Sequence, residues 1–119
     1  MKPLLHAKSS VKKYGGVVED YLPIHNFMDC SKSSVPDVRH RAVLHSSWGI
    51  YLAELFFGEY FQNAQGRDVS TRDIAEQHVI EDLGFIPTME KWLEGMPIAP
   101  WMGGQRITRQ VMDFTKEQD

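Results

Sequence analysis

The sequence has very little cysteine and no long apolar run. Among its 119 residues Cys30 is the single cysteine, which excludes an internal disulfide framework and a zinc knuckle built from several cysteines. No apolar segment approaches the roughly 18–20 residues of a membrane-spanning helix, and the two leucines after Pro3 are too few for a signal peptide. The sequence therefore predicts a cytoplasmic protein that does not enter a membrane.

The chain also lacks a strong excess of either charge. It has 13 Lys and Arg against 16 Asp and Glu, a net charge of −3, which argues against nucleic acid as the main partner. Leu, Ile, Val and Phe make up about a quarter of the residues, above the roughly 20% below which disorder is typical. The composition predicts one folded domain over residues 1–104. Residues 105–119 are predicted to form a C-terminal extension, either a docking helix or a frayed tail.

The motifs of several enzyme classes are absent. The sequence contains no His-Asp dipeptide, no His-Glu-x-x-His and no Glu-x-x-His, the patterns of His-Asp phosphohydrolases, zinc proteases and di-iron proteins. No serine lies in Gly-x-Ser-x-Gly, and neither glycine pair has the flanks of a phosphate loop. Cys30 follows Asp29, whose negative charge disfavours a reactive thiolate. Any chemistry must therefore rest on the histidines and nearby carboxylates.

Apolar periodicity and capping residues predict an all-α, or mainly α, compact domain of four to five helices with short loops. The clearest helix start is Ser34, with Pro36 in the first turn and Asp37 three residues after the serine. The helix from Pro36 is expected at the centre of the fold, packed around Trp48, with Gly49 allowing a neighbouring helix to cross closely. The predicted helices span 3–14, 20–31, 36–57, 71–83 and 87–94.

Two of the five histidines have a carboxylate four residues later, His25 with Asp29 and His78 with Asp82. Residues four apart on a helix have Cβ atoms about 5–6 Å apart. Each pair can therefore chelate a divalent ion such as zinc or manganese, with a third ligand from another helix. Each can equally be an ordinary hydrogen bond that holds two helices together. His78 and Asp82 are the main metal candidates, and His25 and Asp29 are the weaker ones.

His45 and His40 are the candidates for the additional ligand. His45 falls on the apolar stripe of the predicted helix 36–57 and is expected to be buried. On one straight helix the two histidines would point about 140° apart, so both cannot bind one ion. His40 shares a face with Glu54, but fourteen residues of helix separate them by about 21 Å. The sequence therefore predicts that His40 and Glu54 belong to different sites.

Arg39, Arg41 and Arg72 are the candidates for anion binding. Arg39 and Arg41 would lie about 200° apart on a helix, so they cannot form one clamp from that helix alone. The favoured interpretation pairs each arginine with an acid, for which the candidates are Asp20, Asp37 and Asp73.

A series of motifs follows in order along the chain: Gly15-Gly16, Asp20-Tyr21, Ile24-His25, Asp29, Ser31-Lys32, Arg39-His40-Arg41, His45, Gly49-Ile50, Glu54, Phe57-Gly58, and the run from Arg72 to Val79 and from Glu81 to Thr88. Over about residues 6–102 this series resembles a family of small uncharacterised proteins of bacteria and their phages. The family carries no established activity. The resemblance implies a bacterial host cell, where small acidic phage proteins often bind host or defence components.

Two functional hypotheses follow. In the first, His78 and Asp82 with His45 or His40 bind a divalent metal that lowers the pKa of a bound water, and Arg39 or Arg72 holds the oxygens of a phosphate-containing substrate. In the second, the protein is a non-catalytic phage accessory or anti-defence protein that binds a host protein or a nucleotide. Neither hypothesis includes an oligomeric state.

Overall fold

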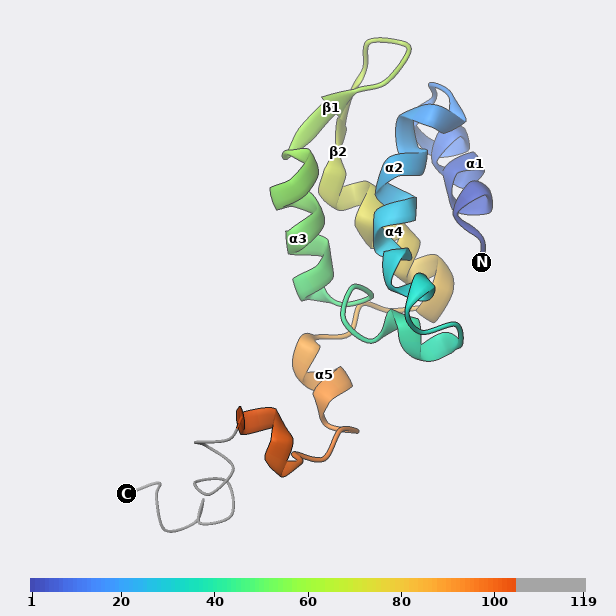
Figure 1. Cartoon of the computed structure of the whole chain (residues 1–119). Coiled ribbons are helices and arrows are strands. Elements are labelled where there is room, and N and C mark those ends of the chain that lie inside the picture. Colours follow the sequence, from blue (N-terminus) through green and yellow to red (C-terminus); the bar gives the residue numbers. More distant parts are fainter. Residues whose placement is uncertain (105–119) are drawn as a thin grey trace.

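The chain folds as a helical bundle with one short hairpin, which confirms the predicted mainly helical class (Figure 1). The computed structural model describes residues 1–104, so the predicted extension lies outside the described residues. In chain order the elements, with 3₁₀ helices labelled η, are α1 (Pro3–Tyr14), α2 (Val18–Met28), η1 (Cys30–Ser33), η2 (Val38–Arg41), α3 (Ser47–Phe57), β1 (Tyr60–Gln62), β2 (Asp68–Ser70), α4 (Thr71–Leu83), α5 (Met89–Leu93) and η3 (Pro100–Gly103).

Helices α1, α2 and α4 lie close to their predicted positions because their ends carry clear capping signals. Helix α2 begins at Val18, slightly before the predicted start, because the Asp20 carboxylate accepts a hydrogen bond of 2.8 Å from the Val17 backbone N–H. The Ser70 hydroxyl caps α4 by accepting the Asp73 N–H, and Gly84 ends it at a φ of 84°.

The predicted helix over 36–57 is wrong in its first half. Asp37 accepts the Arg39 N–H, but this cap starts only the short 3₁₀ helix η2. The α-helix begins at Ser47, where the Ser46 hydroxyl accepts the Gly49 N–H at 3.2 Å. The Ser34–Pro36 signal therefore marks a turn, and the chain from 36 to 46 bends instead of continuing one axis. This bend controls where two histidines lie.

Gly49 lies where the bend folds back onto α3. A Cβ added at this position would overlap the backbone of Leu44. The glycine is therefore needed by a turn within the same segment, and not by a crossing helix as predicted. Trp48, next to it, is 45% exposed, so the prediction of a core around Trp48 is wrong as well.

The turn-rich residues 63–68 connect a two-stranded antiparallel hairpin that the sequence did not predict, with Phe61 opposite Val69. Asn63 fastens this hairpin to the helices, because its side-chain amide donates to the Tyr14 carbonyl and the Tyr21 hydroxyl, both at 3.1 Å. The hairpin covers one end of the bundle and leaves the other end to α5 (Figure 1).

The apolar core lies between α1, α2, α3 and α4, the helices that pack most closely on one another. Within residues 1–104 no helix has both the length and the apolar character needed to cross a membrane. The buried apolar side chains are Ala7, Tyr21, Ile24, Met28, Ile50, Ala53, Val69, Ile74, Ala75 and Val79.

Candidate metal centre

All five histidines of the chain are buried beside this apolar core, each from a different segment. None exposes more than 6% of its surface, and four are fully buried. Histidine is ordinarily only partly buried, and a buried polar ring needs partners. The five come from α1 (His6), α2 (His25), η2 (His40), the turn before α3 (His45) and α4 (His78).

Two of these histidines converge with two carboxylates. His45 Nε2 lies 2.8 Å from Asp82 Oδ2 and 3.6 Å from Asp29 Oδ1. His78 Nε2 lies 3.2 Å from Asp29 Oδ1 and 3.4 Å from Asp82 Oδ2. One ligand atom from each of the four residues lies within 4.8 Å of every other. Two nitrogens and two oxygens thus surround one point.

The spacing suits a small divalent ion. Four ligands about 2.0–2.1 Å from zinc at tetrahedral corners have neighbouring atoms about 3.3–3.4 Å apart. The four nitrogen–oxygen separations between His45 or His78 and Asp29 or Asp82 range from 2.8 to 3.6 Å. The rings of His45 and His78 cross at 72°, so their in-plane lone pairs can meet at one centre.

His40 adds a third nitrogen at the edge of the same group. Its Nδ1 lies 2.8 Å from the Asp37 carbonyl oxygen, so Nδ1 carries the proton and donates it. In the neutral ring Nε2 then presents a lone pair to Asp29 Oδ1 at 3.4 Å. A lone pair facing a carboxylate oxygen is unfavourable unless a cation or a second proton lies between them.

Hydrogen bonds alone satisfy part of this cluster. His45 can donate its Nε2 proton to Asp82, and His78 can donate its Nε2 proton to Asp29. The same solution fails for neutral His40, because its one proton already goes to the Asp37 carbonyl. A cation held by the four-residue cluster would satisfy the Nε2 atoms of His45 and His78.

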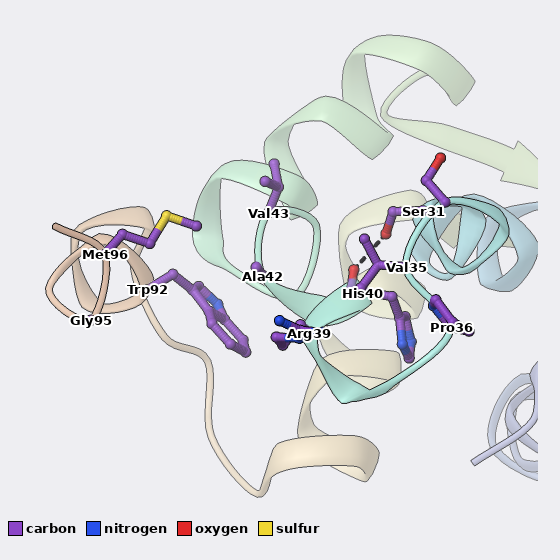
Figure 2. Close-up of a pocket in the computed structure, with 11 residues that line it drawn as sticks. Ser31, Val35, Pro36, Arg39, His40, Ala42, Val43, Trp92, Gly95 and Met96 are labelled. Atoms are coloured by element: carbon purple, nitrogen blue, oxygen red, sulfur yellow. Dashed lines mark hydrogen bonds between the residues drawn. The ribbon is translucent and has the colours of Figure 1, made fainter. Parts of the chain in front are cut away.

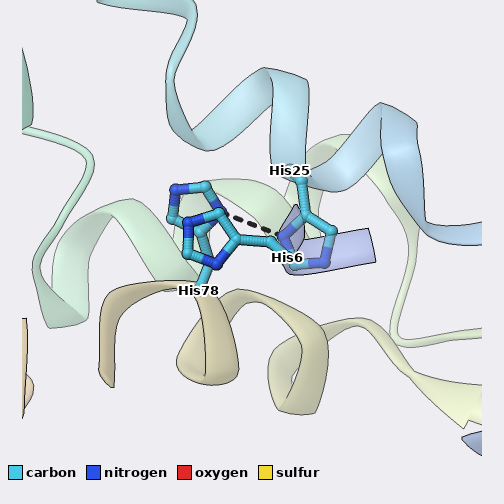
Figure 3. A group of neighbouring side chains, drawn as sticks. All are labelled: His6, His25 and His78. Atoms are coloured by element: carbon cyan, nitrogen blue, oxygen red, sulfur yellow. Dashed lines mark hydrogen bonds between the residues drawn. The ribbon is translucent and has the colours of Figure 1, made fainter. Parts of the chain in front are cut away.

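The other close group of histidines has a different geometry. His6, His25 and His78 are stacked, with interplanar angles of 20–29° (Figure 3). The lone pairs of stacked rings lie in nearly parallel planes and do not point to a common centre. This group is therefore suited to hydrogen bonding behind the four-residue cluster.

A chain of hydrogen bonds runs from His78 away from the cluster. His78 Nδ1 and His25 Nδ1 are 2.9 Å apart, and His25 Nε2 lies 2.9 Å from the Ser10 hydroxyl, which lies 2.9 Å from the Gln77 side-chain oxygen. If Nε2 of His78 binds a metal, its Nδ1–H donates to His25, and His25 donates onward to Ser10. Burial and the nearby His78 and His6 lower the pKa of His25 to about 2, so His25 is neutral and able to accept.

His6 supports the cluster through carboxylates. Its Nδ1 lies 2.7 Å from Glu81 Oε1, and its Nε2 lies 3.2 Å from Asp82 Oδ1 without hydrogen-bond alignment. Burial lowers the pKa of His6, but the carboxylates of Asp82 and Glu81 outweigh burial and raise it. Ser9 fixes the second oxygen of Glu81 at 2.5 Å. The Met1 ammonium donates to Asp82 Oδ1 at 3.1 Å, and the other oxygen, Oδ2, faces His45.

The two cluster carboxylates are ionised. Burial raises the pKa of Asp82, yet hydrogen bonds from His45 and His6 outweigh it and hold that pKa far below the usual range. Burial likewise opposes ionisation of Asp29, but the hydrogen bond from His78 lowers its pKa overall. Burial lowers the pKa of His78. Two buried negative charges thus face a neutral His78, and the Met1 ammonium, 3.1 Å from Asp82 Oδ1, balances part of that charge.

The sequence-predicted pairs have unequal outcomes. His78 and Asp82 face each other one turn apart on α4, with Nε2 and Oδ2 separated by 3.4 Å. Within the described chain no hydrogen bond or ion pair joins His25 to Asp29. His25 faces Ser10 and His78, whereas Asp29 points into the four-residue cluster.

The structure does not contain the straight helix on which His40 and His45 could not share one ion. Their rings lie 5.9 Å apart at 88°, and both Nε2 atoms are within 3.6 Å of Asp29 Oδ1. The bend over residues 36–46 replaces that straight helix. Burial of His45, by contrast, is as expected. Glu54 pairs with Arg72 and contributes nothing to the cluster.

No sequence pattern indicated that His6 and Glu81 belong to the site. His6 has no carboxylate three or four residues away, and its partner Glu81 is 75 positions later. Their contact depends on α1 lying against α4.

The three candidate arginines pair with three different carboxylates and form no common clamp. Only Arg41 reaches the cluster, and its buried Nε has no partner within the described residues. The pairs are Arg39 Nη2 with Asp37 Oδ2 at 2.7 Å, Arg72 Nε with Glu54 Oε1 at 2.9 Å, and Arg41 Nη2 with Asp82 Oδ1 at 3.8 Å.

Comparison with known proteins gives a family without an assigned role. Residues 1–102 match the family described as a domain of unknown function (DUF6915). No curated protein and no solved structure shows significant similarity to the chain. All six residues of the two groups, the three stacked histidines and the four-residue cluster with His78 in common, lie inside the matched range.

Proposed function

We propose that this chain, which belongs to the DUF6915 family, binds one divalent transition-metal ion through Asp29, His45, His78 and Asp82. The observation that carries the proposal is the buried convergence of these four ligands, with nitrogen–oxygen separations of 2.8–3.6 Å. His40 lies beside this group, with its Nε2 atom 3.4 Å from Asp29 Oδ1. Mixed nitrogen and oxygen ligands favour zinc or manganese.

The activity we propose for this metal site is hydrolysis of a phosphate-containing substrate. An ion that keeps a coordination position beyond these four ligands, as octahedral manganese does, would lower the pKa of a water bound there, so that hydroxide could form near neutral pH. The hydroxide would attack phosphorus, the phosphorus–oxygen ester bond would break, and the leaving oxygen would take up a proton. Arg41 and the Met1 ammonium, 3.8 and 3.1 Å from Asp82 Oδ1, are the cations beside the cluster that would stabilise the charge on the phosphoryl oxygens.

Metal analysis of protein purified without a histidine tag tests the proposal. We expect about one equivalent of zinc or manganese in the wild-type chain, and a large loss in Asp82→Asn. Asp68→Asn is the matched control, because Asp68 is an exposed carboxylate on the hairpin. Less than about 0.2 equivalents of any transition metal, with no thermal shift on adding zinc or manganese, would overturn metal binding.

Hydrolysis is tested separately with 4-nitrophenyl phosphate. We expect turnover by the metal-loaded protein that is lost in Asp82→Asn and retained in Asp68→Asn. Full metal loading without turnover would overturn the hydrolytic step and leave metal binding standing.

A second candidate function is binding of a macromolecular partner, the role that a phage setting would favour. It is supported by an apolar face on α3, where Leu55 is 64% and Phe56 is 72% exposed. These residues, with Phe27 and Leu52, line a shallow cavity of about 360 Å³. Exposed apolar patches of this kind often mark interaction sites. Recovery of the same stoichiometric host protein by wild type and Phe56→Ser in parallel pull-downs would contradict this candidate.

A further inference from the structure

A separate cavity lies beside the metal cluster, between the η1–η2 segment and α5 (Figure 2). Its volume is about 630 Å³, within the roughly 300–1,000 Å³ typical of small-molecule sites. His40 belongs to both places, because it lines the cavity and its Nε2 lies 3.4 Å from Asp29. A ligand in this cavity is therefore one side chain away from the proposed ion.

One wall of the cavity is a fixed aromatic ring. The Trp92 indole N–H donates to the His45 carbonyl oxygen at 2.8 Å, which holds the ring in place. The other apolar lining comes from Val35, Pro36, Val43 and Met96. A flat apolar group can pack against the Trp92 ring with little loss of side-chain freedom, because the ring is already ordered.

The lining carries a positive charge and an unused guanidinium nitrogen. Arg39 is the charged residue of the lining, and none of the lining residues is acidic, although the whole chain has a net charge of −3. In Figure 2 Arg39 lies between Trp92 and His40. Asp37 orients the guanidinium by accepting from Nε and Nη2, and none of these bonds uses Nη1. A guanidinium with five N–H donors can bind a further oxyanion.

We infer that this cavity binds a small aryl phosphate, with its flat body on Trp92 and its phosphoryl oxygens between Arg39 and His40. The inference rests on the proposed function in one respect. His40 lies at the end of the cavity nearest the metal ligands, so a phosphoryl group bound there would be next to the proposed ion. The site thus specifies the class of the substrate, which is a phosphomonoester of a flat apolar alcohol.

Calorimetric titration with phenylphosphonate, which cannot be hydrolysed, tests this assignment on the zinc-loaded and the metal-free chain. Methylphosphonate supplies the anionic head alone, and benzyl alcohol supplies the apolar body alone. We expect phenylphosphonate to bind at least about tenfold more tightly than either fragment. Arg39→Gln and Trp92→Leu should each weaken it by at least about tenfold, and Trp92→Phe, which keeps a flat ring, by less.

Arg67→Gln and Trp101→Leu are the matched controls, since both residues lie outside the cavity lining, and their affinities should stay within about twofold. Equal affinity for phenylphosphonate and methylphosphonate would overturn the inference, as would unchanged binding in Arg39→Gln. Metal content, measured on the same samples, reports separately on the metal site. A chain that binds no metal but still binds phenylphosphonate through Trp92 and Arg39 retains the cavity assignment and loses only the metal proposal.

Discussion

His45 Nε2 lies 2.8 Å from Asp82 Oδ2 although 37 positions separate the two residues. The contact brings the turn before α3 against the last turn of α4. It also aligns His45 with the carboxylate that His78 faces from one helical turn away. The relationship defines the candidate metal centre, and the predictions below depend on it.

Asp82→Asn should lower zinc affinity by at least about 100-fold, because it replaces a charged ligand with a neutral amide. Mutation of a residue that only hydrogen-bonds to a metal ligand already lowers metal affinity by about 10–100-fold. Zinc affinity is measured by competition with a chromogenic chelator. Asp68→Asn should bind zinc as the wild type does. Equal affinity in Asp82→Asn and wild type would show that Asp82 is not a ligand.

His25 should act as a positioning residue that accepts the Nδ1–H of His78. His25→Leu removes this acceptor and should lower zinc affinity by about 10–100-fold. His25→Asn keeps an acceptor near the Nδ1 position and should recover most of the affinity. A merely structural role predicts instead that both variants lose folding stability without a difference in zinc affinity once folded.

The metal-free protein should lose stability as the pH falls below 6.5. The pKa values of His25 and His78 are lowered in the fold from their ordinary value of 6.5, so the unfolded chain binds more protons below that pH. Each histidine therefore contributes stability that is present above 6.5 and falls by up to about 1.4 kcal/mol per pH unit on acidification. His6, with a raised pKa, has the opposite sign and loses its contribution as the pH rises.

Urea unfolding in EDTA at about pH 7 and about pH 5 measures this slope. The free energy of unfolding of His25→Asn should change less with pH than that of wild type. The difference in slope should correspond to about one bound proton. Equal stability at the two pH values would contradict the neutral, buried state of His25 and His78.

Removal of the metal should destabilise the wild-type chain. An ion that binds only the folded state stabilises it by about 2.7 kcal/mol when its free concentration is 100 times the Kd. A chelator should therefore lower the Tm of wild type and leave the Tm of Asp82→Asn unchanged. A Tm of the wild type that does not respond to the chelator would be inconsistent with a bound ion.

Gly49→Ala should destabilise the fold, whereas the same change inside an ordinary helix would stabilise it. The added Cβ meets the Leu44 backbone, so we expect a loss of about 1–3 kcal/mol in the free energy of unfolding. Gly95→Ala is the control, because its Cβ would lie 3.8 Å from the nearest atom, the Trp92 carbonyl oxygen. Chemical denaturation measures both, and a stable Gly49→Ala would mean that the bend before α3 can shift.

The sequence was sufficient where the signal is local. Helix α4 follows from its Ser70 cap and its Gly84 end, and the pairing of His78 with Asp82 follows from their spacing on it. The region 36–46 shows the limit, because Ser34 and Pro36 satisfy a helix-start pattern that here precedes a 3₁₀ turn. Short-range patterns do not distinguish an α-helix from a 3₁₀ turn at this position, because the tertiary contacts of the segment decide between them.

The convergence of the site was beyond sequence reasoning for the same reason. His40 and His45 meet only because the chain bends between them, and His6 reaches Glu81 only because α1 packs on α4. Periodicity shows that His45 is buried but not which side chains it meets.

The long reach of the His6–Glu81 contact, 75 positions along the chain, bears on the order of assembly. Contacts that close large loops form late in folding, because the entropy of closure must be overcome first. We expect the cluster to be completed near the end of folding, after the nearby pairs of helices have docked. An ion that binds the finished cluster slows unfolding and leaves the folding rate almost unchanged. Metal would then set how long each folded molecule lasts, and not how quickly it forms.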